Sequence, residues 1–176
     1  MLEDAWNDIL KADEKGRPKA IYRAAHAYDD VILSQEVISD ESFDFLIKII
    51  KSDQVANSRG IEHFLLEVNC DFEKYNRTQQ DLLLKTIREF APNYTDYMGL
   101  HTFGDLVARA YQPDCAYDFF MSLLGKSEAA NTISFVGFDV LRMRLDKSNP
   151  LYKRVMLQWS KVLDDENKKR AERKPT

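Results

Sequence analysis

The chain has few residues that interrupt regular structure, with six glycines and five prolines among its 176 residues. So few turn-forming residues leave little room for a loop-rich β fold and favour helices. Hydrophobic residues make up 44% of the chain and charged residues 31%, which is an ordinary globular composition of a length that suits one domain.

Cysteine is also scarce. Cys70 and Cys115 are the only two cysteines, too few and too isolated for a disulfide framework or a zinc site. Both fall on expected helices, so we predict buried free thiols. The N-terminus has no apolar segment of the signal-peptide type, and no apolar run approaches the roughly 18 residues of a membrane span. We therefore expect a cytoplasmic protein without membrane contact.

Sequence signatures of catalysis and cofactor binding are missing as well. There is no Gly-rich phosphate loop, nucleophile elbow or His-Glu-x-x-His motif. His26, His63 and His101 have no second His or Cys three or four residues away, so we predict no metal site. Glu62 and Glu67 could act as an acid and base pair only if their pKa values differed, and we interpret them as part of a solvated acidic face. We therefore predict that the chain is not an enzyme and needs no cofactor.

Acidic residues are concentrated in one stretch of the chain. Residues 29–73 contain eleven acids and three bases, a net charge of −8, whereas the whole chain has −4. Such a stretch argues against binding to a phosphate backbone, which requires clustered Lys and Arg. It leaves open attraction to a basic protein partner, because a surface of one charge sign speeds encounter with the opposite sign.

A repeat with a period of 37 residues organises the middle of the chain. Asp44, Asp81 and Asp118 each precede three large apolar residues and stand 37 positions apart. Further along each copy, an apolar residue precedes a phenylalanine by three positions. These pairs are Ile61 with Phe64, Leu100 with Phe103, and Phe135 with Phe138. A fixed period in the thirties predicts stacked helix pairs, because one pair cannot bury its own apolar face.

Apolar stripes at helical spacing predict about nine helices, which are antiparallel because the loops are short. We expect them at residues 2–13, 18–33, 41–52, from Gly60 to about 72, as a pair within 78–110, and at 113–124, 131–145 and 150–163. Pro18 suits the first turn of a helix, and Gly125 suits the position after one. The predicted fold is all-α: a single domain over residues 1–163 of antiparallel helices stacked as HEAT-like hairpins, followed by a polar tail over residues 164–176.

The second helix of each pair is expected to line the concave side of the stack, where such proteins bind their partners. Helical projection turns the acids of these helices, together with Thr102, away from the apolar stripes, which predicts an acidic groove. Tyr94 and Tyr97 lie at a turn between helices, either as recognition residues at the rim or as caps of the core. The predicted partner-binding residues are Glu62, Glu67, Asp71 and Asp105, with Asp29, Asp30, Tyr97 and Arg109 at the rim.

Over residues 41–145 the period and the short second helices resemble HEAT- and armadillo-type α-solenoids. Three segments resemble the immunity proteins of bacterial contact-dependent growth inhibition systems. They are residues 14–30 (EKGRPKAIYRAAHAYDD), 99–111 (GLHTFGDLVARAY) and 136–142 (VGFDVLR). The resemblance implies tight binding to a cognate toxin domain, often a nuclease, whose active site is blocked. It supplies no catalytic motif.

Three functions remain open at this point. The first is an immunity protein that neutralises a basic toxin domain, of nuclease type, as a monomer in a 1:1 heterodimer without contacting nucleic acid itself. The second is a general α-solenoid scaffold for protein interactions, which the identity of the neighbouring gene distinguishes from the first. The third is a helical-repeat enzyme acting on nucleic acid bases, like the HEAT-like DNA glycosylases. That enzyme requires a basic groove, and the acidic stretch 29–73 argues against it.

Overall fold

The computed structural model describes the backbone of residues 1–172 and the side chains of residues 1–165, 167 and 168. This part of the chain folds into ten α-helices and two 3-10 helices, without a strand. The elements are α1 (Leu2–Lys11), α2 (Arg17–Leu33), α3 (Asp40–Ile50), α4 (Asp53–Ala56), α5 (Ile61–Cys70), η1 (Phe72–Lys74), α6 (Arg77–Phe90), η2 (Ala91–Asn93), α7 (Tyr97–Ala110), α8 (Pro113–Leu123), α9 (Glu128–Arg144) and α10 (Pro150–Glu172). The predicted all-α, single-domain fold is confirmed.

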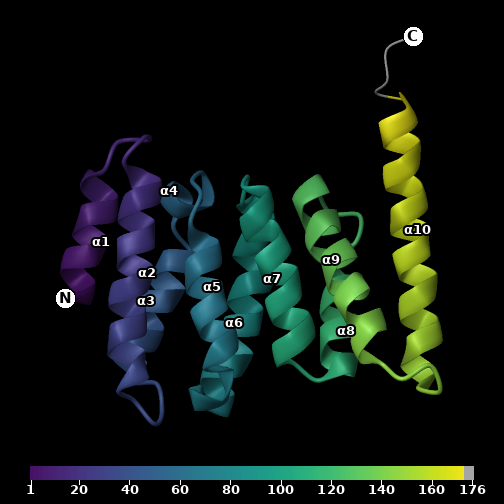
Figure 1. The fold of residues 1–176 in the computed structure, drawn as a ribbon. Helices are drawn as coiled ribbons and strands as arrows, with labels where there is room; N and C mark the ends of the chain where they lie inside the picture. Colours follow the sequence, from purple (N-terminus) through teal and green to yellow (C-terminus); the bar gives the residue numbers. More distant parts are fainter. Residues whose placement is uncertain (173–176) are drawn as a thin grey trace.

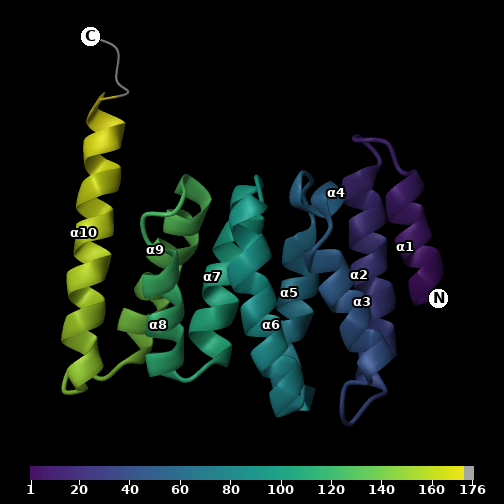
Figure 2. The same cartoon turned by 180° about the vertical axis from the view of Figure 1, so that it is seen from behind.

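The helices form two rows along the molecule. Helices α2, α5, α7 and α9 contact one another in chain order, with α1 against α2 at one end and α10 against α9 at the other (Figure 1). Helices α3, α6 and α8 lie on the other side of this row, toward the viewer in Figure 2. Each 37-residue repeat therefore contributes one helix to each row, since α3, α6 and α8 carry the repeated acid and α5, α7 and α9 the repeated phenylalanine.

Local sequence signals set the ends of several helices. The side chain of Asn76 accepts a hydrogen bond from the backbone N–H of Gln79, and the side chain of Gln79 accepts one from the backbone N–H of Asn76. This pair of hydrogen bonds caps the start of α6. Pro18 and Pro113 occupy the first turns of α2 and α8. Gly125 follows α8 with a φ of 80°, a conformation that glycine adopts without strain.

The second helices of the pairs, α5, α7 and α9, approach each other closely at positions occupied by glycine. A Cβ atom built on Gly99 of α7 lies 2.6 Å from Cγ2 of Ile61 in α5. A Cβ atom built on Gly104 of α7 lies 2.6 Å from the carbonyl oxygen of Ile133 in α9. A larger residue at Gly99 requires the Ile61 side chain or its helix to shift, and one at Gly104 requires the backbone of α9 to shift. The glycines therefore hold α5, α7 and α9 at short spacing and fix their exposed sides relative to one another.

Buried tyrosines connect neighbouring helix pairs. The hydroxyl oxygens of Tyr28 and Tyr75 lie 2.7 Å apart, and both side chains are buried. Burial is the largest cause that raises the pKa of both hydroxyls, so both remain neutral and hydrogen-bonded. Tyr94 is also buried, and its hydroxyl donates to the carbonyl oxygen of Ile50 at 3.1 Å. Of the two interpretations of Tyr94, the structure confirms the core residue.

Two differences from the predicted helices exceed a shift of a few residues at a helix end. The segment after Ser52, which lies between two predicted helices, contains the one-turn helix α4, in which the Ser52 side chain caps the helix and Val55 is buried. The described residues therefore contain ten α-helices, where about nine were predicted. Helix α10 continues to Glu172, so the helix end predicted at Leu163 was wrong, because Glu, Lys, Arg and Ala make up most of residues 164–172 and no Gly or Pro occurs before Pro175. The predicted tail, 164–176, thus begins inside α10, and residues 173–176 lie outside the described part of the chain.

Candidate functional site

We call the side of α2, α5 and α7 that is turned away from α3 and α6 the outer face. In α2 the buried side chain of Tyr28 points into the core, which leaves Asp29 half-buried beside α5 and Asp30 exposed. In α5 the buried Val68 leaves the preceding Glu67 half-buried on the outer face. The amphipathic stripes of two helices thus bring acids distant in sequence to one surface.

Asp29, Asp30 and Glu67 form what we call the acidic site. Burial raises the pKa of Glu67 above its ordinary value. The charge of Asp29, a side-chain hydrogen bond to Asp29 and the charge of Asp71 raise it further, whereas His26 lowers it. The carboxyl groups of Asp29 and Glu67 are therefore close neighbours on different helices. No Lys or Arg among the described side chains forms an ion pair with any of the three acids. The acidic site is therefore a group of carboxylates without a Lys or Arg partner among the described side chains.

Asp71 and Asp105, two other predicted residues, have cations of their own. Asp71 lies 2.9 Å from Nζ of Lys74, and Asp105 lies 2.8 Å from Nε of Arg109. Opposite charges at this distance weaken each other's field, although the charge of Asp71 still contributes to the raised pKa of Glu67. Asp71 and Arg109 also line the same open hollow of about 370 Å³, between the end of α5 and the end of α7. The structure thus brings Asp71 and Arg109 to the same hollow. Each already has an ion-pair partner, Lys74 for Asp71 and Asp105 for Arg109.

Glu62 supports the start of its own helix. One of its carboxylate oxygens accepts the backbone N–H of Gly60 at 2.9 Å, and the other lies 3.8 Å from Nε2 of His63. A carboxylate at this position also interacts favourably with the positive end of the helix dipole. Glu62 therefore has local partners, which distinguishes it from Glu67.

Tyr97 is the first residue of α7 and is 62% exposed, with its ring centre 6.2 Å from that of His101. Asp105 and Arg109 lie two and three turns further along the same helix. The predicted partner-binding residues are thus spread over the outer face. The acidic site is the part of the predicted set in which acids from two helices meet.

A cluster of rings that the sequence prediction did not include lies on the same face. The ring of Tyr22 contacts His26 of α2 and His63 of α5 edge-on, with ring centres 4.4 Å and 4.8 Å away. Tyr22 is nevertheless 45% exposed, and Leu66 on α5 is 51% exposed. A ring that neighbours already hold loses little side-chain freedom on binding a partner. The spacing of Tyr22 and His26 is visible in the sequence, but the contact with His63 depends on the packing of α2 against α5.

Two predictions about individual side chains were wrong. Cys70 and Cys115 are free thiols, but both are exposed instead of buried. Cys70 is the last residue of α5, and Cys115 lies in the first turn of α8, where helix ends leave side chains accessible. Thr102, predicted to face outward, is 9% exposed, and its hydroxyl donates to the carbonyl oxygen of Met98 at 2.8 Å. That hydrogen bond satisfies the hydroxyl within its own helix.

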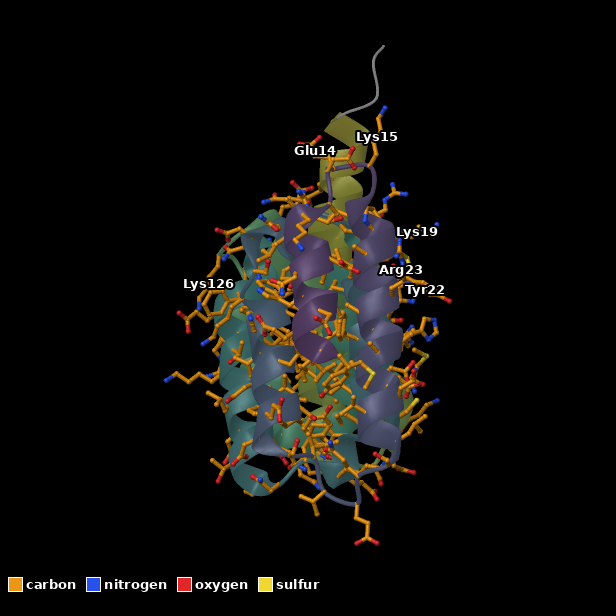
Figure 3. The ribbon with its side chains drawn as sticks, turned by 90° about the vertical axis from the view of Figure 1, so that its left-hand side faces the viewer. Glu14, Lys15, Lys19, Tyr22, Arg23 and Lys126 are labelled. Atoms are coloured by element: carbon orange, nitrogen blue, oxygen red, sulfur yellow. The ribbon has the colours of Figure 1, made fainter. Side chains whose placement is uncertain are left out.

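Lys15, Lys19 and Arg23 form a second charged group, which we call the basic stripe. They stand four residues apart in the turn before α2 and in its first half, and all three are exposed. In Figure 3 Lys19, Tyr22 and Arg23 project from the same side of the stack. The four-residue spacing is a signal that the sequence contains, because such residues share a helix face. The stripe precedes the acidic stretch 29–73, so the net charge of that stretch does not reveal it.

Within the described residues, no group of three or more His, Cys, Asp or Glu side chains is arranged to hold a metal ion. None of the helices in residues 1–172 has both the length and the apolar character needed to cross a membrane. Comparison of the chain with protein-family models, with curated proteins and with solved structures gave no match. The function is therefore inferred from the residues of the outer face.

Proposed function

We propose that the chain is a non-enzymatic, cytoplasmic immunity protein that binds a basic toxin domain, of nuclease type, through the outer face of α2 and α5. The observation that supports this proposal is the acidic site. Asp29, Asp30 and Glu67 have no ion-pair partner among the described side chains, and Asp29 raises the pKa of Glu67. A nuclease must present cationic groups to its phosphate substrate. Such groups are chemically matched to carboxylates without cations of their own.

A cation of the partner relieves the repulsion between two neighbouring carboxylates. A Lys or Arg side chain between Asp29 and Glu67 forms charge-assisted hydrogen bonds, each worth about 1–3 kcal/mol. Part of the desolvation cost is already met in the free protein, because both carboxyl groups are half-buried before binding. The Lys or Arg of the toxin that is bound in this way cannot bind phosphate. The remaining acidic charges repel a nucleic acid from the surface around it. Neutralisation by this route requires no chemical step.

Tyr22 and Leu66 give the same surface an apolar centre. Both are about half exposed, at 45% and 51%, although they lie on helices whose other faces are buried. Protein interfaces commonly combine an aromatic anchor at the centre with charged groups at the rim. The charges thus steer the encounter, and burial of the ring and of the leucine side chain contributes to affinity.

The proposal is tested by co-expression with the toxin domain encoded by the neighbouring gene. The chain is expected to form a 1:1 complex with that domain and to restore growth of the cells that produce it. The double variant D30K/E67K is expected to lose both properties. The matched control D44K/D118K reverses two exposed acids on α3 and α8, on the opposite side of the stack, and is expected to retain both. Absence of a complex with the wild-type chain, or equal losses in the two variants, would overturn the proposal.

A general interaction scaffold is the alternative function. Leu82 on α6 and Met121 on α8 are 41% and 38% exposed, on the side opposite to the outer face. A scaffold uses several surfaces for several partners. Amide exchange that slows on α6 and α8 as well as on α2 and α5 in an isolated complex would favour the scaffold. Protection restricted to α2, α5 and their neighbours favours the immunity protein.

A further inference from the structure

Helix α2 carries its charges in the order that opposes its own dipole. Its first turn contains Arg17 and Lys19 and no acid, and its last turn contains Asp30 and no base. The N-terminal end of a helix is partially positive and the C-terminal end partially negative, so both placements destabilise α2. Helices α1, α3 and α9 have the favourable order, with acids in the first turn and bases in the last.

The basic stripe also has no compensation from neighbouring side chains. Within the described part of the chain, Lys15, Lys19 and Arg23 form no ion pair. Like charges four residues apart on a helix repel each other. Arg17 differs from these three, because its guanidinium donates to the carbonyl oxygen of Ala12 at 3.0 Å. Local rules broken at several points in one element are expected where a surface serves binding.

The basic stripe and the acidic site occupy the two ends of one surface. Lys19 and Asp30 both lie on α2, and their separation in sequence corresponds to about 16 Å along the helix axis. Tyr22 lies between them, with its ring against His26 and His63. Figure 3 shows Lys19, Tyr22 and Arg23 directed away from the stack, with Lys126 on the opposite side of the molecule. The surface is therefore bipolar and has an exposed ring between its poles.

We propose that the outer face of α2 is a docking site with two poles. The proposal rests on the proposed function: cations of the partner bind the acidic site, while carboxylates of the same partner bind the basic stripe. The partner is a folded protein with an acidic patch about 16 Å from its basic patch. The two poles together fix the orientation of the partner and reject basic proteins that have no such acidic patch.

Carboxylates fit the basic stripe better than a nucleic acid does. Three cations neutralise few phosphates, and the affinity for a phosphate backbone rises with the number of phosphates that are neutralised. Asp29 and Asp30 follow the stripe on the same helix and repel a backbone that continues along α2. A protein surface, in contrast, can present negative groups to one pole and positive groups to the other.

NMR titrations of the full chain with simple charged probes test each pole separately. Oligoglutamate probes the basic stripe, oligolysine probes the acidic site, and a single-stranded oligonucleotide probes the alternative ligand. Oligoglutamate is expected to shift the amide signals around Lys19 and Arg23. Oligolysine is expected to shift those around Asp30 and Glu67. A weaker response to the oligonucleotide than to oligoglutamate is expected at the basic stripe.

Charge reversal separates a binding role of the stripe from a structural one. The variant K19E/R23E is expected to weaken oligoglutamate binding at least about 10-fold. It is also expected to raise the Tm by about 2 °C, because acids suit the start of α2 better than bases. The control K85E/K126E reverses two exposed lysines, one on α6 and one after α8, and is expected to leave oligoglutamate binding unchanged.

The possible outcomes decide between the ligands and between the two proposals. Unchanged oligoglutamate binding in K19E/R23E, or an equal loss in K85E/K126E, would overturn the basic pole. A fall in Tm of K19E/R23E would also overturn it, since it would show that the stripe stabilises the fold. Tighter binding of the oligonucleotide than of oligoglutamate at the same amides would replace carboxylate by phosphate as the ligand. Failure of oligolysine to shift the signals of the acidic site would refute the proposed function and, with it, the partner described here.

Discussion

The outer face contains carboxylates in two different states. On α2 and α5, Asp29, Asp30 and Glu67 have no ion-pair partner within the described side chains, and burial and Asp29 raise the pKa of Glu67. On α7, Asp105 is held by Arg109 at 2.8 Å, one helical turn away. The first group is available to a cation of another molecule, whereas Asp105 already has a cationic partner in its own helix. A count of acids along the sequence does not separate the two states, because the field depends on the distances between charges.

Charge reversal in the two regions should have the most unequal effects. D30K/E67K is expected to weaken binding to the proposed toxin partner by about 1,000-fold, or about 4 kcal/mol, because two attractive contacts become repulsive. D105R/R109D, which exchanges the partners of the α7 ion pair, is expected to change the affinity by less than about threefold. Isothermal titration calorimetry measures both. Similar losses in the two variants would remove the distinction between the regions.

The two exposed tyrosines of the outer face should also differ. Tyr22 is held by His26 and His63 beside the acidic site, whereas Tyr97 lies 6.2 Å from one histidine at the start of α7. Y22A is expected to weaken partner binding by about 30-fold, the effect of removing a central aromatic anchor. Y97A is expected to weaken it by less than about threefold. A larger effect of Y97A in the same calorimetric measurement would move the centre of the interface to α7.

Substitution of Gly99 should weaken the packing of α7 against α5 without altering the acidic site. A Cβ atom at this position lies 2.6 Å from Cγ2 of Ile61 in α5. G99A is expected to lower the free energy of unfolding by about 1 kcal/mol, since the steric cost exceeds the gain in helix propensity. Urea denaturation measures this change. Oligolysine binding at Asp30 and Glu67 should be unchanged, and a variant as stable as the wild type would contradict the close approach of α5 and α7.

Removal of the α7 cation should make that region resemble the acidic site. In R109Q the carboxylate of Asp105 loses its partner at 2.8 Å. The stability cost is expected to be about 0.3–0.5 kcal/mol, the usual value for an exposed pair one turn apart. Oligolysine should then shift the amide signals around Asp105, which it leaves unchanged in the wild type. No new shifts in R109Q would mean that ion pairing does not explain the difference between the regions.

The smallest effect concerns the protonation of Glu67. A raised pKa means that the folded state binds the proton more tightly than the unfolded state, so stability decreases as the pH rises through the ordinary and then the raised pKa. E67Q removes this penalty and is expected to have a higher Tm than the wild type at pH 7. The difference should vanish below the ordinary carboxyl pKa, about 4. Thermal unfolding at both pH values checks the sign, and E89Q, at an exposed acid of α6, is the control.

The repeat was predictable because it depends on apolar residues at regular spacing. Asp44, Asp81 and Asp118 fall on α3, α6 and α8, and the phenylalanines that follow fall on the second helices, as the period requires. Helix α4 was not predictable from periodicity, because four residues make only one turn. The end of α10 was missed for a different reason. A polar sequence without apolar residues continues a helix when its residues have high helix propensity.

The candidate site was predictable in part. The pairing of Asp105 with Arg109 follows from their spacing of four residues, as does the alignment of Lys19 and Arg23. The proximity of Asp29 and Glu67 does not follow from sequence spacing, because it depends on how α2 and α5 are aligned along their axes. Sequence patterns within one helix therefore give charges that share a face. Which helices place such charges side by side is decided by packing.

The central claim is that a basic protein docks on the outer face of α2 and α5. Hydrogen exchange of the chain, free and bound to the proposed toxin partner, tests it most directly. The account predicts slower amide exchange in Arg17–Leu33 and Ile61–Cys70, with exchange in Pro113–Leu123 unchanged. Protection in Pro113–Leu123 without protection in the other two helices would contradict it.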